Sequence, residues 1–293
     1  MVLIVSRSLL SPEETMSRSM PIQLVAIDID RTLLDDNRGV SEANLAALRR
    51  AQAKGAQIAL CSGRDLPSTR AISQPMGLAF WLVIQNGSLV IDPAGRAVYT
   101  CSLSEATANR ALDVLNRHGL GPVVYELYPR AQHVWWQEGA RSAPGMLEFR
   151  REHGAVITVI KDIRSVLTKP VSHLEVFDSA ERVLAADREF AADPEVVAIT
   201  NLSSSQRGAA LMGIYPAGTS KERALEQIAR TLGITSAEVL AIGDNLNDIG
   251  MVRWAGMGVM VANGPEEARK AADWVAPSNN ESGVAAAIER FVG

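Results

Sequence analysis

The sequence predicts an α/β protein built on a parallel sheet, with an α+β domain inserted into the chain that forms it. Three observations carry this prediction. Short apolar runs that end in polar or glycine residues alternate with helical segments in the first third of the chain, and the last third repeats this pattern. Such runs are typical of parallel strands, because helices cover both faces of their sheet. The middle of the chain breaks the pattern, and 293 residues are enough for two domains.

Each predicted strand in the first third is a continuous apolar run that ends in polar residues. The first strand leads into Asp28, the second into Ser62, and the third into Asn86. These strands cover residues 24–27, 57–61 and 81–84. The helices between them cover about 41–54, with Ser41 as the cap, and a segment that ends near residue 73.

The last third begins with a predicted helix. Thr219 and Glu222 have the spacing of a capping box, which places Lys221 in the first turn of that helix. Two further buried strands follow, at residues 239–242 and 258–261. Because ligands of parallel sheets bind beyond the carboxyl ends of the strands, we expect the polar residues at those ends to form one site.

The middle of the chain mixes one helix with short alternating segments. The helix is expected at 106–118, and the strand-like segments at 123–125, 133–136, 156–160 and 174–177. We interpret residues 91–207 as an inserted α+β cap domain, because the flanking parts, 20–90 and 208–293, need each other to complete a sheet. Residues 1–19 are expected to be a loose extension, since charged residues interrupt their apolar runs too often for a signal peptide or a membrane span.

Composition excludes several classes of function. The chain has 29 Lys and Arg against 33 Asp and Glu, and it contains no basic block, so a nucleic-acid partner is not expected. Its two cysteines cannot form a disulfide framework, and no Cys/His cluster indicates zinc. We therefore expect a cytoplasmic protein without a membrane partner.

Two acidic motifs follow buried strands. Asp28 and Asp30 are two residues apart, so on an extended chain both carboxylates can face one ligand. After the strand at 239–242 comes Gly243, with Asp244 and Asp248, a string that chance would supply only about 0.05 times in a chain of this composition.

The order of the motifs identifies a family. The chain carries an Asp-x-Asp string, then Ser-Gly at a strand end, then a lysine at a helix start, then Gly-Asp with a second Asp. In this order they resemble the four motifs of the haloacid dehalogenase superfamily of phosphatases, and more closely its Cof-type branch with a large α/β cap. The resemblance spans the chain from about Met20 to its end. It implies a Rossmann-like, doubly wound parallel sheet core.

The resemblance also implies a chemistry. Asp28 would attack phosphorus to form an aspartyl-phosphate, and Asp30 would protonate the leaving alcohol and then activate water. The metal would be Mg²⁺, held by the Asp28 side chain, the Asp30 backbone carbonyl and Asp244. Asp248 would hold the water ligands of that ion.

Further residues would bind the phosphate and the rest of the substrate. Ser62, Gly63, Lys221 and Asn247 are expected to contact the phosphoryl oxygens, with Lys221 also offsetting charge during catalysis. The residues expected to meet the leaving group are Arg31, Arg64, Asn86, Arg130 and His133. Arg31 departs from the Cof-type pattern, which usually has glycine at that position.

The expected activity is therefore that of a Mg²⁺-dependent phosphomonoesterase acting on small phosphorylated metabolites. Sugar phosphates are favoured, and nucleotides, FMN and pyridoxal phosphate are further candidates. A phosphomutase of the same superfamily is the alternative within enzymes, and a non-catalytic phosphate-binding or regulatory module is the alternative outside them. Asp30 and the inserted cap argue against a regulatory receiver module, which needs neither of them.

Overall fold

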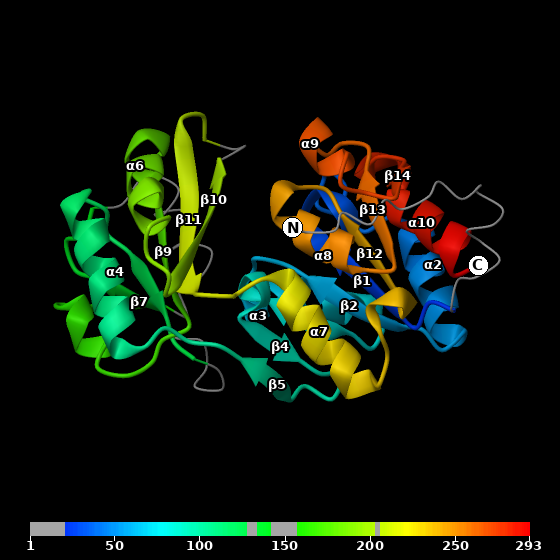
Figure 1. Ribbon diagram of the computed structural model, residues 1–293, viewed down its shortest axis with the longest axis horizontal. Coiled ribbons are helices and arrows are strands. Elements are labelled where there is room, and N and C mark those ends of the chain that lie inside the picture. Colours follow the sequence, from blue (N-terminus) through cyan, green and yellow to red (C-terminus); the bar gives the residue numbers. More distant parts are fainter. Residues whose placement is uncertain (1–20, 128–133, 142–156, 203–205) are drawn as a thin grey trace, which may run out of the picture. The chain divides into compact units, whose positions relative to one another are not determined.

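A computed structural model describes residues 21–127, 134–141, 157–202 and 206–293. The chain divides into two compact units, one made of Met1–Ile58 and Ala229–Gly293 and the other of Ala59–Ile228. Figure 1 colours the chain along its sequence, from blue at the N-terminus to red at the C-terminus. The predicted extension at residues 1–19 lies outside the described residues. The units divide the chain elsewhere than at 91 and 207, so the predicted domain boundaries stay a prediction.

The first unit contains four parallel strands. They are hydrogen-bonded in the order β14-β13-β12-β1, with bounds Trp274–Ala276, Met257–Val261, Val239–Gly243 and Leu24–Asp28. Its helices are α2 (Glu42–Ala53), α8 (Ile249–Trp254), α9 (Glu266–Arg269) and α10 (Gly283–Phe291). Every residue of β1 and β12 is buried, as the continuous apolar runs predict.

Two polar side chains tie the helices of this unit in place. The Ser41 hydroxyl accepts a hydrogen bond from the Asn44 amide and caps α2, as predicted. Asn44 is itself buried, and its side-chain oxygen accepts a hydrogen bond from the backbone of Ala285 in α10 at 2.9 Å. The two helices are therefore linked by a satisfied buried amide as well as by apolar packing.

The second unit begins inside β2 (Gln57–Cys61), which pairs in parallel with β3 (Trp81–Ile84). The helix α3 (Leu66–Ser73) connects them. Two antiparallel strands, β4 (Leu89–Ile91) and β5 (Ala97–Thr100), continue the same sheet. The sheet thus extends past residue 91, where we expected the inserted domain to begin.

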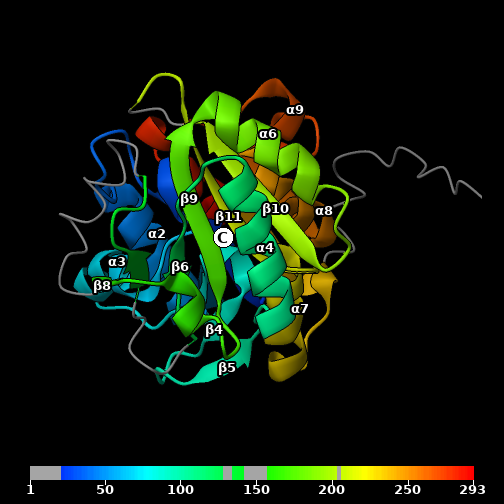
Figure 2. The ribbon, with the colours of Figure 1, turned by 90° about the vertical axis from the view of Figure 1, so that its left-hand side faces the viewer.

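The same unit contains a second sheet of six strands. Their order is β10-β11-β9-β6-β7-β8, with bounds Val196–Leu202, Ala209–Pro216, His173–Ser179, Val123–Tyr125, Val134–Gln137 and Ile157–Ile160. All neighbours are antiparallel except β7 and β8. Two helices, α4 (Glu105–Arg117) and α6 (Ala180–Phe190), lie on one face of this sheet (Figure 2).

Alternate residues of the six-stranded sheet face these helices. Val124, Leu174 and Met212 pack with α4 and α6 in one apolar core. Tyr125 and its neighbours point to the opposite face and form a smaller cluster. This alternation follows from the pleat of a strand, in which successive side chains point to opposite faces.

The helix α7 (Lys221–Leu232) begins at the predicted lysine, but its predicted cap is wrong. The Ser220 hydroxyl, not that of Thr219, accepts a hydrogen bond from the backbone of Arg223. Ser220 directly precedes the helix, and only a side chain in that position reaches the third helical amide. The Thr219 hydroxyl instead lies 3.2 Å from the Cys101 sulfur. Within the described ranges, no helix is both long and apolar enough to cross a membrane.

Candidate active site

Three aspartates of the first unit form a buried acidic cluster. Asp28 ends β1 and Asp244 follows β12, two neighbouring parallel strands that pair through Ile27 and Ile242. One carboxylate oxygen from each of Asp28, Asp244 and Asp248 lies within 4.8 Å of the other two. All three residues are less than a tenth exposed. Carboxylates so close repel one another, so the cluster is suited to a cation.

Asp248 holds the loop that carries Asp244. It is fully buried, and its Oδ2 accepts hydrogen bonds from the backbone amides of Asp244 at 3.0 Å and Asn245 at 3.1 Å. Gly243 allows this arrangement, because a Cβ at that position would lie 2.5 Å from the Cβ of Asp248. The spacing in the Gly-Asp-x-x-x-Asp string therefore lets the Asp248 carboxylate accept a hydrogen bond from the Asp244 backbone.

Thr32 is a member of the site that the sequence analysis did not select. Its hydroxyl donates a hydrogen bond to Oδ1 of Asp244 at 3.2 Å, and the residue is fully buried. The tight turn at Ile29–Leu33, closed by a bond from the Leu34 amide to the Ile29 carbonyl, brings Thr32 to this position. Thr32 lies beside the Asp28 and Asp30 motif in the sequence, but only the turn shows that its hydroxyl reaches Asp244 in the other acidic motif.

Asp30 and Arg31 are exposed in the same turn. Arg31 has φ 61°, the left-handed conformation that glycine adopts without strain. This explains why glycine is usual at this position in the family that the sequence resembles. The Arg31 carbonyl accepts a hydrogen bond from the Asn263 side chain at 2.8 Å, which supports the strained backbone. The Asn247 side chain, expected at the phosphate, is also exposed.

The second unit carries three of the four predicted phosphate-binding residues, Ser62, Gly63 and Lys221. Ser62 follows β2, and its buried hydroxyl accepts a hydrogen bond from the Arg64 amide at 3.1 Å. The turn at Gln85–Gly87 packs on this loop, because the Asn86 amide donates to the Ser62 carbonyl at 3.0 Å and the Gln85 amide to the Arg64 carbonyl at 2.9 Å. Gly63 lies between these bonded residues. The two strand-end loops therefore hold each other in place.

The same turn packs against the start of α7. Gly87 has φ 98°, and a Cβ there would collide with the Ser220 carbonyl, which directly precedes Lys221. Lys221 is only 3% exposed. Within this unit the structure therefore brings the Ser62 loop, Asn86 and the Lys221 backbone into one neighbourhood.

Three residues predicted to meet the leaving group have different outcomes. The Asn86 side chain points to β11, where its amide donates to the Tyr215 hydroxyl at 3.0 Å. Arg130 and His133 lie outside the described residues. The roles assigned to all these residues stay predictions.

Comparison with known proteins settles the family. The model of the haloacid dehalogenase-like hydrolases matches residues 25–288. This chain belongs to that family. It is 29% identical to the Bacillus subtilis protein named 5-amino-6-(5-phospho-D-ribitylamino)uracil phosphatase YcsE, over 92% of this chain and 96% of that protein. It is also 29% identical to phosphatase YwpJ of the same organism, over 90% of this chain and 98% of that protein.

A solved structure agrees in fold. A haloacid dehalogenase-like hydrolase from Bacteroides thetaiotaomicron superimposes with a TM-score of 0.77 at 24% identity, covering 92% of this chain and 99% of that one. The predicted α/β architecture with a mainly parallel sheet is confirmed. Together with the curated relatives, the family match makes the chain an enzyme, a phosphatase.

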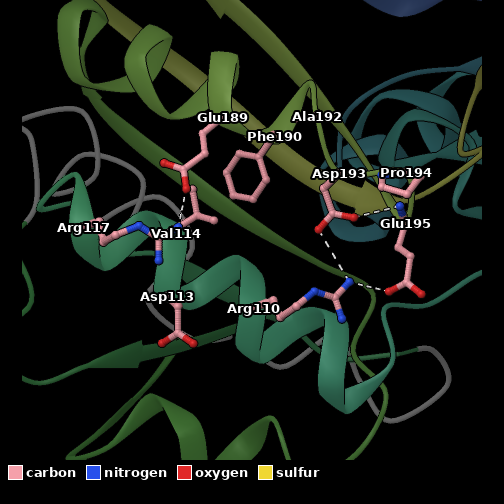
Figure 3. A pocket seen from close by; sticks show the side chains of 10 residues that line it. All are labelled: Arg110, Asp113, Val114, Arg117, Glu189, Phe190, Ala192, Asp193, Pro194 and Glu195. Atoms are coloured by element: carbon pink, nitrogen blue, oxygen red, sulfur yellow. Dashed lines mark hydrogen bonds and ion pairs between the residues drawn. The ribbon is translucent and has the colours of Figure 1, made fainter.

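This haloacid dehalogenase-like hydrolase also has a surface groove of about 650 Å³ between α4 and the segment that follows α6 (Figure 3). Its charged side chains are paired with opposite charges: Arg110 with Asp193 and Glu195, Arg117 with Glu189, and Asp113 with Arg164. These ion pairs link α4 to α6 and to the segment that follows it.

Proposed function

We propose that this protein is a Mg²⁺-dependent phosphomonoesterase that hydrolyses small phosphorylated metabolites through an aspartyl-phosphate on Asp28. The buried cluster of Asp28, Asp244 and Asp248 is the observation that carries the proposal. Three buried carboxylates this close together destabilise a fold through their mutual repulsion. A bound cation would offset that repulsion. A cation held there would also attract the anionic phosphate group of a substrate.

The donor set fits Mg²⁺. The cluster offers only carboxylate oxygens, and a hard ion of this size prefers oxygen ligands. Asp28, Asp244 and the Asp30 carbonyl would hold the ion, with Asp248 orienting its water ligands. When bound, Mg²⁺ would offset the repulsion between the carboxylates and the phosphate.

The proposed reaction has two steps. In the first, an Asp28 carboxylate oxygen bonds to phosphorus while the ester P–O bond breaks, and Asp30 gives its proton to the leaving alkoxide. In the second, Asp30 takes a proton from water, whose oxygen displaces the Asp28 carboxylate and releases phosphate. Asp28 is buried and Asp30 exposed, which suits a fixed nucleophile and an acid that meets the leaving group.

Four further residues are proposed to bind the phosphate. The Ser62 hydroxyl, the Gly63 amide and the Lys221 ammonium are the proposed donors, together with the Asn247 side chain. Support comes from the loops around Ser62 and Asn86, whose mutual hydrogen bonds keep them rigid before substrate arrives.

Sugar phosphates are the proposed substrate class. The curated relative YcsE is named for a substrate whose phosphate sits on a ribityl chain, a polyhydroxylated alcohol. Arg31 and Arg64, near the proposed phosphate site in sequence, are the candidate contacts for the rest of such a molecule. We place the reaction in a reducing cytoplasm, because both cysteines, Cys61 and Cys101, are free thiols.

Phosphate release from a panel of small phosphomonoesters, with and without Mg²⁺, tests the proposal. We expect turnover that requires Mg²⁺ and falls at least about a thousandfold in Asp28→Asn, which removes the nucleophile. Glu189→Gln, the same kind of change on α6, is the matched control and should keep full activity. Isomerised esters without free phosphate would instead show a phosphomutase, and no reaction in folded protein would show a binding module.

A further inference from the structure

The face of the six-stranded sheet opposite α4 and α6 carries a stack of three rings. Tyr125 on β6, His173 on β9 and Tyr215 on β11 lie side by side, with centroids 4.1 Å apart for the first pair and 4.6 Å for the second. All three are nearly inaccessible to solvent. Burial lowers the pKa of His173 to about 3, so this ring is neutral at physiological pH. The stack is a rigid, uncharged support.

This stack is connected to the loop that follows Ser62. The Asn86 amide donates to the Tyr215 hydroxyl at 3.0 Å, and the Asn86 backbone binds the Ser62 carbonyl. One residue before His173, the Ser172 hydroxyl donates to the Gln85 side chain at 2.8 Å. Every one of these contacts lies within the second unit. The ring stack and the proposed phosphate loop are therefore held together by buried hydrogen bonds.

Glu175 stands on the same face as the rings. It lies two residues beyond His173 on β9, and it pairs with Val123 and with Gly213 on the neighbouring strands. The side chain is partly exposed, unlike the rings beside it. The Tyr125 hydroxyl donates a hydrogen bond to its Oε1 at 3.3 Å. Among the described residues, this hydroxyl is its only hydrogen-bond partner and no cation pairs with it.

The carboxyl of Glu175 therefore has acceptor capacity to spare. A carboxylate has two oxygens and about four acceptor positions, of which Tyr125 uses one. Burial raises the pKa of Glu175 to about 7, and the nearby Asp65 carboxylate acts in the same direction. Asp65 caps α3, three residues after Ser62, so this influence also relates Glu175 to the phosphate loop.

We propose that Glu175 is a specificity-determining residue that accepts hydrogen bonds from hydroxyl groups of the leaving alcohol, with Tyr125 as its positioning residue. Two carboxylate oxygens suit two neighbouring hydroxyls, so the favoured class is phosphate esters of polyhydroxylated alcohols. The inference rests on the proposed phosphomonoesterase function and deepens it. Neither Glu175 nor Tyr125 belongs to the machinery that acts on phosphorus.

Two esters with equal carbon chains test this preference. Ribitol 5-phosphate carries hydroxyls on its leaving group, and n-pentyl phosphate carries none. At pH 8 we expect Glu175→Gln to lower kcat/KM for the ribitol ester about tenfold, because a charged acceptor binds hydroxyls more strongly than a neutral one. The pentyl ester should react as in the wild type. Glu189→Gln should change neither value.

Tyr125→Phe tests the positioning role through pH. The ratio of kcat/KM for the two esters should rise with pH as Glu175 ionises, and the phosphate group cancels in this ratio. The Tyr125 hydroxyl lowers the pKa of Glu175, so its removal should move the midpoint of the rise to higher pH. The other titratable groups facing Glu175 are His173 on β9, Tyr215 on β11 and Asp65 before α3. A merely structural role for Tyr125 would leave the midpoint in place.

The outcomes separate the two proposals. If the wild type hydrolyses both esters and Glu175→Gln changes them equally or not at all, the inference is overturned and the phosphatase function stands. If the wild type hydrolyses neither, the proposed function fails. Calorimetric binding of ribitol 5-phosphate then decides the inference: Asp28→Asn should bind it about tenfold more tightly than Asp28→Asn with Glu175→Gln. Equal binding by these two variants overturns the inference.

Discussion

The acidic cluster and the groove beside α4 differ in charge and in burial. The cluster is wholly negative and buried, whereas the groove mixes both signs at the surface. In the first unit, three carboxylates with oxygens within 4.8 Å of one another lie almost out of contact with solvent. In the second, the groove beside α4 mixes Arg110 and Arg117 with Glu189, Asp193 and Glu195, all of them ion-paired and reachable by water. Chemistry is expected at the cluster and not in the groove.

This contrast separates a candidate functional site from a structural contact. Like charges repel strongly where water is excluded, so a fold retains them only where a ligand uses them. Opposite charges at the surface neutralise each other and contribute little. Carboxylates that are buried close together are therefore a better guide to function than the volume of a groove. The predictions below test this contrast.

The largest effect is expected from Asp244→Asn. Mg²⁺ at 100 times its dissociation constant should stabilise the wild type by about 2.7 kcal/mol. For a chain of this size, that raises Tm by roughly 5 to 10 °C. The variant should lose this shift, because one carboxylate ligand becomes a neutral amide. Differential scanning fluorimetry across a Mg²⁺ titration measures it, and an unchanged shift would place the ion elsewhere.

A smaller loss is expected from Thr32→Val, which keeps the shape of the side chain and removes the hydroxyl bound to Asp244. Partners that orient a metal ligand are worth about 10- to 100-fold in affinity or activity, so the Mg²⁺ concentration for half-maximal turnover should rise by that factor. Thr107→Val makes the same change in α4, where the hydroxyl binds Glu195. Equal Mg²⁺ dependence in both variants would contradict the role given to Thr32.

Glu175 lies between these two cases, since it is a single, partly exposed acid among buried rings. Its pKa is raised to about 7 in the fold, above the value for an unfolded chain, so its ionisation destabilises the fold as pH rises toward 7. Glu175→Gln should therefore have a higher Tm than the wild type at pH 8, and the difference should shrink at pH 5. Thermal melts at the two pH values measure this difference in Tm. A difference that does not change with pH would contradict the raised pKa of Glu175.

The smallest effect is expected in the groove. Glu195→Gln removes one of the two ion-pair partners of Arg110 at the surface, where an ion pair gains little over water. We expect Tm to change by less than about 2 °C and phosphate release to stay at the wild-type rate. A large loss of activity would show that the groove takes part in catalysis and would break the contrast.

Much of the fold could be predicted because its signals are local. The apolar runs at 57–61 and 81–84 coincide with β2 and β3, since a buried strand needs an uninterrupted apolar stretch. Ser41 caps α2 as predicted, because a cap depends on only a few consecutive residues. The same local argument failed at α7, where Thr219 and Ser220 both offered a hydroxyl and only the helix start decided between them.

The sequence predicted the aspartates of the candidate site, and it did not predict the hydrogen bonds that support them. Asp28, Asp244 and Asp248 were selected from their spacing, and the structure places them together. The bond from Thr32 to Asp244 joins residues far apart in the chain, so no local pattern contained it. Glu175 and Tyr125 were also missed, because their pairing depends on the register between β6 and β9. Register is decided by which face of the sheet is buried.

The fold class, the family and the acidic motifs follow from the sequence alone, since strand ends and motif spacing depend on neighbouring residues. Tertiary structure decided which side chains support those motifs. It alone showed that Arg31 occupies a left-handed turn and that three rings stack beside Glu175. The physical reason is that hydrogen bonds and ring contacts depend on distance in space, and that distance exists only once the sheets have formed.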